Sequence, residues 1–286
     1  MIKNKTLKRL PVAILALLSV FIIGGCSPVK PANGDTLKII ASITPVADFI
    51  KQVGGDKVEV TIMVPAGASP HSYEPSTGQM VAVSEANIFV KVGSGVDYEV
   101  AWMDKIIGMN KEMLIVDCSK GIEIVNGDPH IWTSPLNAKQ MVQNIYNGLI
   151  SEDPANKDYY KANYENYIAE LNDLHDYIGK IFEGYQNRSY LIYHPSFGYF
   201  SSLYGLNQIP IEQEGKEPTP KIMQHSIDQA TEYNLNYVYA DPQSATSYAE
   251  AIAKGISGSV LYIDPLPSSY ISSMRDTANS LALEFE

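Results

Sequence analysis

The chain of 286 residues contains only two cysteines, Cys26 and Cys118. We expect a lipid on Cys26, which leaves Cys118 without a partner and excludes a disulfide framework. Cys118 follows the apolar run 113–116, and this position favours a buried, inert thiol. Stability must therefore come from hydrophobic cores, and the chain is long enough for two domains of ordinary size.

Positive charge is also scarce, with 21 Lys and Arg against 32 Asp and Glu, and only three of these residues are arginines. Such an acidic chain argues against nucleic acid as a partner and against binding to membranes through a polybasic surface. The negative charge is compatible with binding cations. A solvated acidic surface, however, needs no functional explanation.

One apolar run stands out, at residues 12–23, and it follows a basic start at residues 3–9. The run is too short for a comfortable membrane span but is typical of a signal-peptide core. It ends at Ile23-Gly24-Gly25-Cys26, which resembles a lipobox. We therefore predict a signal peptide at 1–25 and lipidation of Cys26, with an ordinary secretory signal as the alternative.

Residues 26–36 are rich in proline, glycine and polar side chains, which predicts a tether between the lipid and the fold. Removal of residues 1–25 leaves 17 Lys and Arg against 32 Asp and Glu, a net charge of −15. We expect an extracytoplasmic protein that is anchored to the cell membrane through Cys26. No second long apolar segment follows, so the rest should be soluble apart from its lipid.

Predicted strands and helices alternate along the rest of the chain. Strict alternation implies parallel sheets with right-handed crossovers, so the fold class is α/β. The predicted strands are 37–42, 57–64, 87–92, 113–117, 189–193, 208–211, 237–240 and 260–263. The predicted helices are 45–53, 76–85, 97–109, 135–150, 154–182, 197–204, 220–233, 244–254 and 268–283.

The longest helical pattern follows Asp153-Pro154 and carries an apolar residue every three or four positions. A helix of about thirty residues is roughly 45 Å long, more than the width of a small domain. A coiled-coil partner could explain it, as could a helix laid along two lobes. We predict two lobes, each with a mostly parallel sheet flanked by helices, joined by one long backbone helix. The predicted segments are an N-terminal lobe at 37–152, a linking helix at 153–185 and a C-terminal lobe at 186–286.

Three histidines and one aspartate follow predicted strands. His71, His130, His194 and Asp264 lie at or beyond the carboxyl ends of strands, where ligands bind in open α/β sheets. Two lobes that face each other would bring the first two towards the last two. Three imidazoles and one carboxylate satisfy the four-coordinate preference of Zn²⁺, although any single histidine is more often structural.

The remaining histidines, His175 and His225, fall inside helical patterns and are interpreted as lying on solvated helix faces.

Four short motifs occur in a characteristic order: 70–75 (PHSYEP), 128–132 (DPHIW), 194–199 (HPSFGY) and 262–266 (YIDPL). With the lipobox, they make the chain resemble the cluster A-I substrate-binding lipoproteins of zinc and manganese ABC importers. The resemblance covers essentially everything from the lipobox to the C-terminus. It implies two α/β lobes joined by a rigid backbone helix, a divalent metal ion as the cargo and an ABC permease as the partner.

The resemblance also implies roles for individual residues. His71 and His130 match the family's first two metal ligands, and His194 matches the third, where manganese-binding members tend to have glutamate. Asp264 matches the acidic fourth position. Imidazole-rich sites favour Zn²⁺ over Mn²⁺, so zinc is the expected cargo and manganese the alternative. Many zinc members have a long His-rich loop before the second ligand, whereas the segment 121–128 is short and lacks histidine.

Side chains around the ligands have expected roles of their own. Trp132, Phe197 and Tyr199 either shield the metal from solvent or pack in the core, and Glu74 or backbone carbonyls could orient an imidazole. We expect a monomer that binds its ion reversibly, with small motions about the helix, and that is not an enzyme.

Three other classes of protein are alternatives. A zinc hydrolase would suit three histidines with Glu74 as its base, but no His-Glu-x-x-His helix occurs and Asp264 would fill the open position. A binding protein for a siderophore or cobalamin should have more arginine in its cleft. No repeat or low-complexity stalk supports a surface adhesin.

Overall fold

The computed structural model describes residues 36–185, 188–212, 216–243 and 246–285. The predicted signal peptide, Cys26 and all of the tether except residue 36 lie outside the described residues. Within these ranges, no helix combines the length and the apolar character that crossing a membrane requires.

Eight strands form two separate four-stranded sheets in the described part of the chain, and every pairing is parallel. The strand orders, β2-β1-β3-β4 and β6-β5-β7-β8, are equivalent. The first sheet consists of β1 (Leu37–Ile43), β2 (Val58–Val64), β3 (Ile88–Lys91) and β4 (Leu114–Asp117). The second consists of β5 (Ser189–Ile192), β6 (Asn207–Pro210), β7 (Tyr237–Ala240) and β8 (Ser259–Tyr262).

Helices connect the strands, and several begin at the signals in the sequence. Ser76 forms a capping box with Gln79. The side chains of Ser134 and Thr219 each cap a helix whose first residue is proline. The α-helices are α1 (Thr44–Gly54), α2 (Thr77–Glu85), α3 (Asp97–Met109), α4 (Pro135–Glu152), α5 (Lys157–Ile181), α6 (Gly198–Tyr204), α7 (Pro220–Glu232), α8 (Thr246–Gly255) and α9 (Tyr270–Ala282). Short 3₁₀ turns are η1 (Gly55–Lys57), η2 (Ile131–Thr133) and η3 (Pro154–Asn156).

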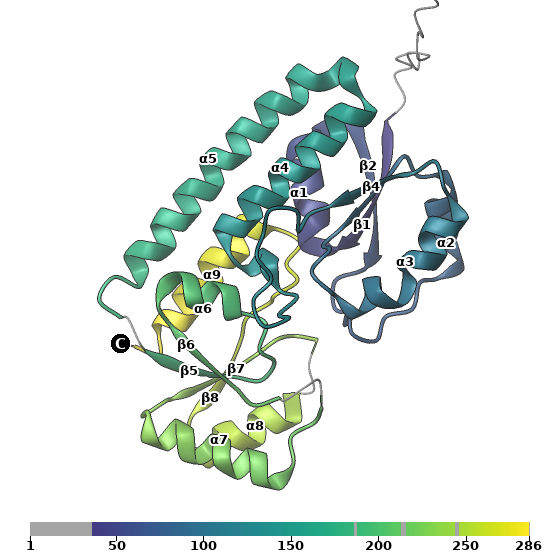
Figure 1. The fold of residues 1–286 in the computed structure, drawn as a ribbon. Helices are drawn as coiled ribbons and strands as arrows, with labels where there is room; N and C mark the ends of the chain where they lie inside the picture. Colours follow the sequence, from purple (N-terminus) through teal and green to yellow (C-terminus); the bar gives the residue numbers. More distant parts are fainter. Residues whose placement is uncertain (1–35, 186–187, 213–215, 244–245, 286) are drawn as a thin grey trace, which may run out of the picture. The chain divides into compact units, whose positions relative to one another are not determined.

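The predicted fold class is confirmed: the chain has two α/β lobes with parallel sheets and helices around them (Figure 1). In each sheet the chain runs from the first strand to one edge and then crosses back to the other side. Such a reversal of strand order is a topological switch point, and the loops at the carboxyl ends of the strands there are a favoured place for ligands.

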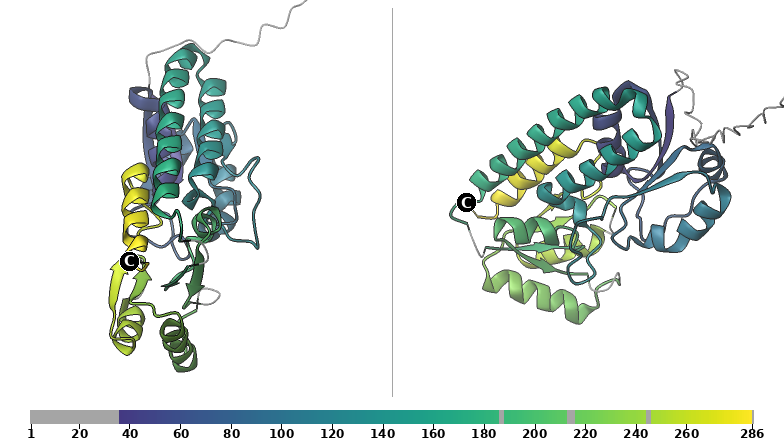
Figure 2. Two further views of the ribbon diagram at one scale, coloured as in Figure 1. Left: turned by 90° about the vertical axis from the view of Figure 1, so that its left-hand side faces the viewer. Right: turned by 45° about the horizontal axis from the view of Figure 1, so that its top comes forward.

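The long helix α5 carries the apolar stripe that its sequence predicts. Tyr160, Tyr167, Leu171, Leu174 and Ile178 are all buried. This face packs against α4, α1 and α9, and Figure 2 shows α4, α5 and α9 as neighbouring rods. Because the stripe is occupied by helices of the same chain, no coiled-coil partner is required to cover it.

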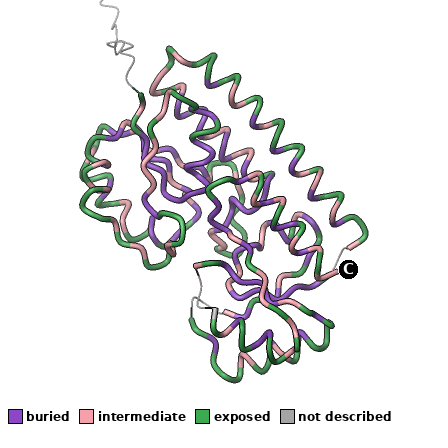
Figure 3. The backbone as a smooth tube through the Cα atoms, turned by 180° about the vertical axis from the view of Figure 1, so that it is seen from behind, coloured by how far each residue is buried: buried purple, intermediate pink, exposed green. Residues whose placement is uncertain are grey.

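The second sheet buries both faces, with alternate residues on opposite sides. Tyr190, Ile192 and Tyr239 belong to a large core that also contains the first sheet, whereas Leu191 and Val238 belong to a smaller core under α7 and α8. Figure 3 shows buried residues in both sheets and on the inner sides of the helices. One continuous core therefore runs between the lobes, and this limits large rearrangements.

Helix α9 shows that the lobes are not simply consecutive in the sequence. It follows the last strand of the second sheet but packs on α5 and α1. The segment before it is also bonded to the N-terminal half, because the Thr44 hydroxyl donates to Leu266 O at 2.6 Å and the Trp132 indole to Pro265 O at 2.6 Å. The boundaries at 152/153 and 185/186 stay predictions.

Candidate metal centre

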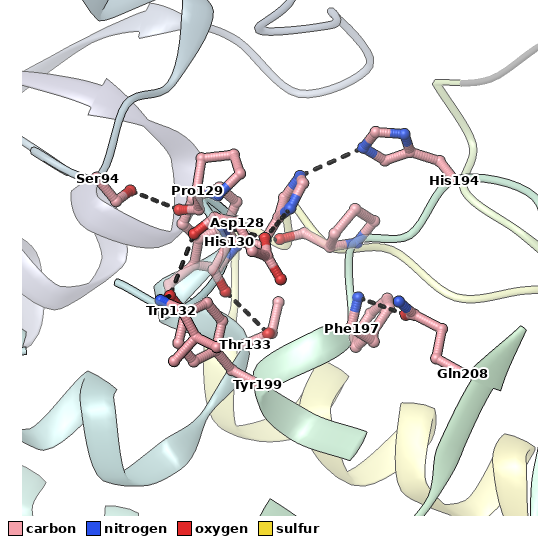
Figure 4. A network of polar contacts seen from close by, with 12 residues as sticks. Ser94, Asp128, Pro129, His130, Trp132, Thr133, His194, Phe197, Tyr199 and Gln208 are labelled. Carbon is pink, nitrogen blue, oxygen red and sulfur yellow. Dashed lines mark hydrogen bonds and ion pairs between the residues drawn. The ribbon is translucent and has the colours of Figure 1, made fainter. Parts of the chain in front are cut away.

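Three of the four predicted ligands lie together between the lobes. Nε2 of His194 is 3.4 Å from Nε2 of His71 and 3.3 Å from Nε2 of His130, and one ligand atom of each histidine lies within 4.8 Å of the others. Figure 4 shows His130 and His194 approaching each other from opposite sides of the cleft. Residues about sixty positions apart thus place their ring nitrogens around a single point.

The two short separations have the size that tetrahedral zinc requires. With Zn–N bonds of 2.0–2.1 Å, the edge of a regular tetrahedron is about 3.3–3.4 Å. Both Nε2 separations that involve His194 match this edge. The third pair, His71 and His130, has its ring centroids 6.4 Å apart, against 5.0 and 5.1 Å for the other two pairs. A small movement of His71, the most exposed of the three, would close the triangle.

Each histidine is oriented by a carboxylate of its own lobe. A metal-binding imidazole usually donates its second N–H to such an acceptor, which selects the tautomer and directs the free nitrogen at the metal. Here Nδ1 is the engaged nitrogen in every case, so each Nε2 faces the centre. The contacts are His71 with Asp97 at 2.6 Å, His130 with Asp128 at 2.7 Å and His194 with Glu212 at 3.2 Å.

Strand register explains the pair in the C-terminal lobe. The adjacent parallel strands β5 and β6 place Ile192 opposite Pro210. His194 and Glu212 each lie two residues beyond these partners, so they leave the sheet side by side. Parallel strands end at a common edge, which is why residues eighteen apart in sequence meet there.

Burial and neighbouring charges shift the pKa values of His130 and His194 in opposite directions. Burial lowers the pKa of His130, and the hydrogen bond and charge of Asp128 offset this only in part. Burial alone would also lower the pKa of His194, but the hydrogen bond and charge of Glu212, with the charge of Asp241, outweigh it and leave the pKa raised. His130 therefore stays neutral to lower pH than His194 does.

Asp264, the fourth predicted ligand, lies outside the group of three histidines. Its Oδ1 accepts hydrogen bonds from the Leu266 backbone N–H at 2.8 Å and from Nε2 of Gln243 at 3.0 Å. Among the residues that the structure describes, no carboxylate completes the group. The geometry does not support direct coordination by Asp264, and the ligand roles of all four residues stay predictions.

The orienting carboxylates were not identified from the sequence. Glu74, the side chain expected in this role, is exposed, and Asp97, Asp128 and Glu212 make the contacts instead. Asp128 could have been found, because an aspartate two residues before a histidine can accept its backbone N–H, as it does here at 2.9 Å.

The three nearby aromatic side chains differ in their surroundings. Trp132 is buried, with its ring centroid 5.3 Å from that of His130, so it shields one side of this imidazole. Phe197 is buried in the large core. Tyr199 is only partly buried, and its hydroxyl reaches the loop before His130.

Two cavities adjoin the histidines, and both are lined by all three of them. One of about 510 Å³ extends towards Glu212 and Leu266. The other, of about 780 Å³, extends under the residues from Val125 to Asp128. The group thus has solvent-connected space next to it, which an ion needs for entry and departure.

Zinc affinity is expected to fall as the pH is lowered, because a protonated imidazole cannot bind a metal. The raised pKa of His194 predicts that the loss begins above the ordinary value of about 6.5, and the lowered pKa of His130 predicts that protonation of this second histidine follows at lower pH. Competitive titration with Zn²⁺ between pH 5 and pH 8 measures this.

The Glu212→Gln variant is the matched control. Without the carboxylate charge the pKa of His194 falls, so the loss of affinity begins at lower pH, while affinity at pH 8 drops about 10–100-fold. Equal affinity of the unsubstituted protein at pH 5 and pH 8 would contradict histidine ligation.

Comparison with known proteins gives consistent matches. The high-affinity zinc uptake system protein ZnuA of Bacillus subtilis is 28% identical over 246 residues, which cover 79% of this chain and 77% of that protein. The zinc-binding lipoprotein AdcA of Streptococcus pneumoniae is 25% identical over 287 residues, which cover 92% of this chain but 56% of AdcA, so the chain spans about half of that relative. The manganese-binding lipoprotein MntA of Halalkalibacterium halodurans is 26% identical over 262 residues, 86% of each chain.

Solved structures agree. A crystal structure of ZnuA superposes with a TM-score of 0.85 at 37% identity and covers 88% of this chain and 100% of that one. Residues 39–283 match the family described as zinc-uptake complex component A, periplasmic. Since this match includes all three histidines and both sheets, the chain belongs to the ZnuA family.

Proposed function

We propose that the protein captures Zn²⁺ between its lobes and delivers it to the permease of an ABC importer. The observation that carries the proposal is the pair of Nε2 separations at the edge length of a zinc tetrahedron, with every Nδ1 turned to a carboxylate. The names of the zinc-binding relatives support the same cargo.

The ligand set favours zinc over manganese. Imidazole suits Zn²⁺, whereas Mn²⁺ prefers oxygen ligands and a higher coordination number. Among the described residues the group consists of histidines alone, so it offers Mn²⁺ too few oxygens. Manganese is the second candidate, because a relative of similar length is named as manganese-binding.

Capture and release should involve loops more than whole lobes. The continuous core and the packing of α9 on α5 and α1 oppose large hinge motions. His71 lies on a long loop after β2 and is the most exposed ligand, so it can move with little loss of packing. The permease would then distinguish the loaded from the empty state by local changes around the cleft.

The site binds its ion without catalysing a reaction. Glu74, the base that a zinc hydrolase would need, is exposed, and the carboxylates beside the histidines are engaged with Nδ1 atoms. Assays of the zinc-loaded protein with ester, peptide and lactam substrates test this, and turnover that requires His194 would overturn it.

The protein acts as a monomer outside the cytoplasm, held at the cell membrane by lipid on Cys26. The lipobox-like residues 23–26 support this location, as do relatives named as lipoproteins. Labelling with a fatty acid tests the anchor, because the Cys26→Ala variant should lose the label. Sedimentation of the protein without its lipid tests whether it is a monomer.

The experiment that tests the cargo is elemental analysis of the purified protein, followed by competitive titration of the stripped protein with Zn²⁺ and Mn²⁺. One zinc per chain, bound more tightly than manganese, is the expected result. Tighter binding of manganese would overturn the choice of metal but not the transport role. Failure of both ions to bind stoichiometrically would overturn metal capture.

A further inference from the structure

The loop at residues 121–128 is bonded to the opposite lobe by one side chain. The backbone N–H of Val125 donates to the hydroxyl of Tyr199 at 3.0 Å. The same hydroxyl lies 3.2 Å from Asp128 O and 3.5 Å from Glu123 O. Since Tyr199 belongs to α6 and the loop follows β4, this contact bridges the cleft. A hydroxyl has one proton, so it donates to one carbonyl while it accepts from Val125.

The tip of the loop is a tight turn that leads directly to Asp128. The Asp128 N–H donates to Val125 O at 3.0 Å, and Asn126 and Gly127 both have positive φ, of 53° and 72°. Asn-Gly is the preferred sequence for such a turn. The next residue, Asp128, accepts both the backbone N–H and Nδ1–H of His130. The position of the loop therefore determines where the carboxylate that orients His130 lies.

Helix α6 also approaches Asp128 through its first residue. A Cβ at Gly198 would lie 2.6 Å from Oδ2 of Asp128, closer than two such atoms can pack. Glycine at this position permits the approach. Gly198 thus leaves room for the carboxylate of Asp128, while the next residue, Tyr199, is bonded to the backbone carbonyl of the same aspartate.

Apolar packing holds the start of the loop, where Ile122 packs against the large core, but does little for the tip. Ile124 and Val125 are 40% and 48% exposed, so hydrophobic burial contributes less here than in the cores. The cavity of about 780 Å³ has Val125, Asn126, Gly127 and Asp128 on its wall together with the three histidines. Movement of the loop tip would therefore widen the access of solvent to the metal group, and the hydrogen bonds to Tyr199 oppose this movement from the other lobe.

We propose that Tyr199 is a positioning residue for metal retention. Its hydroxyl holds residues 121–128 across the cleft and, through Asp128, keeps Nε2 of His130 directed at the ion. The inference rests on the proposed metal binding. When the hydroxyl is absent, the loop and Asp128 move more freely, and the ion departs faster although all three histidines are present.

The test is the Tyr199→Phe variant, compared with the unsubstituted protein by stopped-flow release of Zn²⁺ to a chromogenic chelator. Loss of the two hydrogen bonds is expected to accelerate release about tenfold, with association changed less than about twofold. Amide exchange of Val125 in the metal-free protein should also become faster. The control is Tyr204→Phe, on the same helix, whose hydroxyl contacts Nδ1 of His175 outside the metal group; its release rate should be unchanged.

A second variant acts on the same aspartate without removing the hydroxyl. In Gly198→Ala the new Cβ displaces the Asp128 carboxylate, so release should again accelerate. Two results for Tyr199→Phe would overturn the proposal while zinc capture stands. One is an unchanged rate of zinc release despite faster amide exchange at Val125, and the other is an equal rise in the rate constants for zinc release and zinc association. Lack of zinc binding by the unsubstituted protein would instead overturn the proposed function and this inference with it.

Discussion

Replacing His194 with alanine is expected to lower the affinity for Zn²⁺ by about two to three orders of magnitude. Zinc binding to a complete protein site contributes about 10–16 kcal/mol, so each of the four bonds of a tetrahedral ion accounts for about 2.5–4 kcal/mol. Nε2 of His194 lies within 3.4 Å of both other Nε2 atoms and supplies the only ligand from the C-terminal lobe in the described group. Its loss removes the ion's bond to the C-terminal lobe.

The measurement is competitive titration with Zn²⁺ at pH 8, the end of the range from pH 5 to pH 8 at which protons compete least with the metal. His225→Ala is the matched control, because His225 is exposed on α7 and outside the group; its affinity should equal that of the unsubstituted protein. His130→Ala should resemble His194→Ala, since both ligands are largely buried. A loss of less than about tenfold in His194→Ala would show that the ion is held elsewhere.

Secondary structure and the long helix could be predicted because their signals are local. Tyr160, Tyr167, Leu171, Leu174 and Ile178 are spaced for one helix face, and all five are buried. Strands 237–240 and 114–117 are apolar runs between helical segments, and their sheet order follows from crossover rules only in part. The equivalent orders of the two sheets, and the packing of α9 against α1, depend on contacts between distant segments and left no pattern in the sequence.

The candidate site, too, could be predicted from the sequence only in part. Each histidine follows a strand in the sequence, which indicates that it lies at the ligand-binding edge of its own sheet. The direction of a side chain was not predictable in this way. Asp97 and Glu212 contact histidines of other segments of the chain, so the spacing of these residues in the sequence does not predict the contacts.

Asp264 illustrates how local hydrogen bonding can compete with a ligand role. Three aspartates each precede a proline: Asp128, Asp241 and Asp264. Each side chain accepts a hydrogen bond from the backbone N–H of the residue that follows the proline. After Asp128 the residue that follows the proline is His130, so this carboxylate also orients a predicted metal ligand. At Asp264 it is Leu266, and the turn instead presents backbone carbonyls to Thr44 and Trp132. The same short motif thus serves the metal group in one place and the junction between lobes in another.

Replacing Tyr270 with alanine is expected to reduce the free energy of unfolding by about 3–5 kcal/mol, a large part of the total for a typical protein. Tyr270 is fully buried at the start of α9, and its ring meets Phe49 edge to face at 4.9 Å. Its hydroxyl donates to Trp132 O at 2.7 Å, and its backbone N–H donates to Asp48 Oδ2 at 2.8 Å. The substitution leaves a cavity where α9 joins the helices of the N-terminal lobe.

Two variants separate the ring from the hydroxyl in urea unfolding. Tyr270→Phe keeps the packing but leaves Trp132 O without its donor, so it should cost about 1–2 kcal/mol. Tyr262→Ala, at a tyrosine that is 52% exposed, should change stability by less than about 0.5 kcal/mol. Because the hydrogen bonds and ring contact of Tyr270 join it to Trp132, Asp48 and Phe49, Tyr270→Phe should retain its zinc affinity within a few-fold. Equal stability of Tyr270→Ala and Tyr262→Ala would mean that α9 does not brace the lobes, and the expectation of small motions on metal binding would lose its main support.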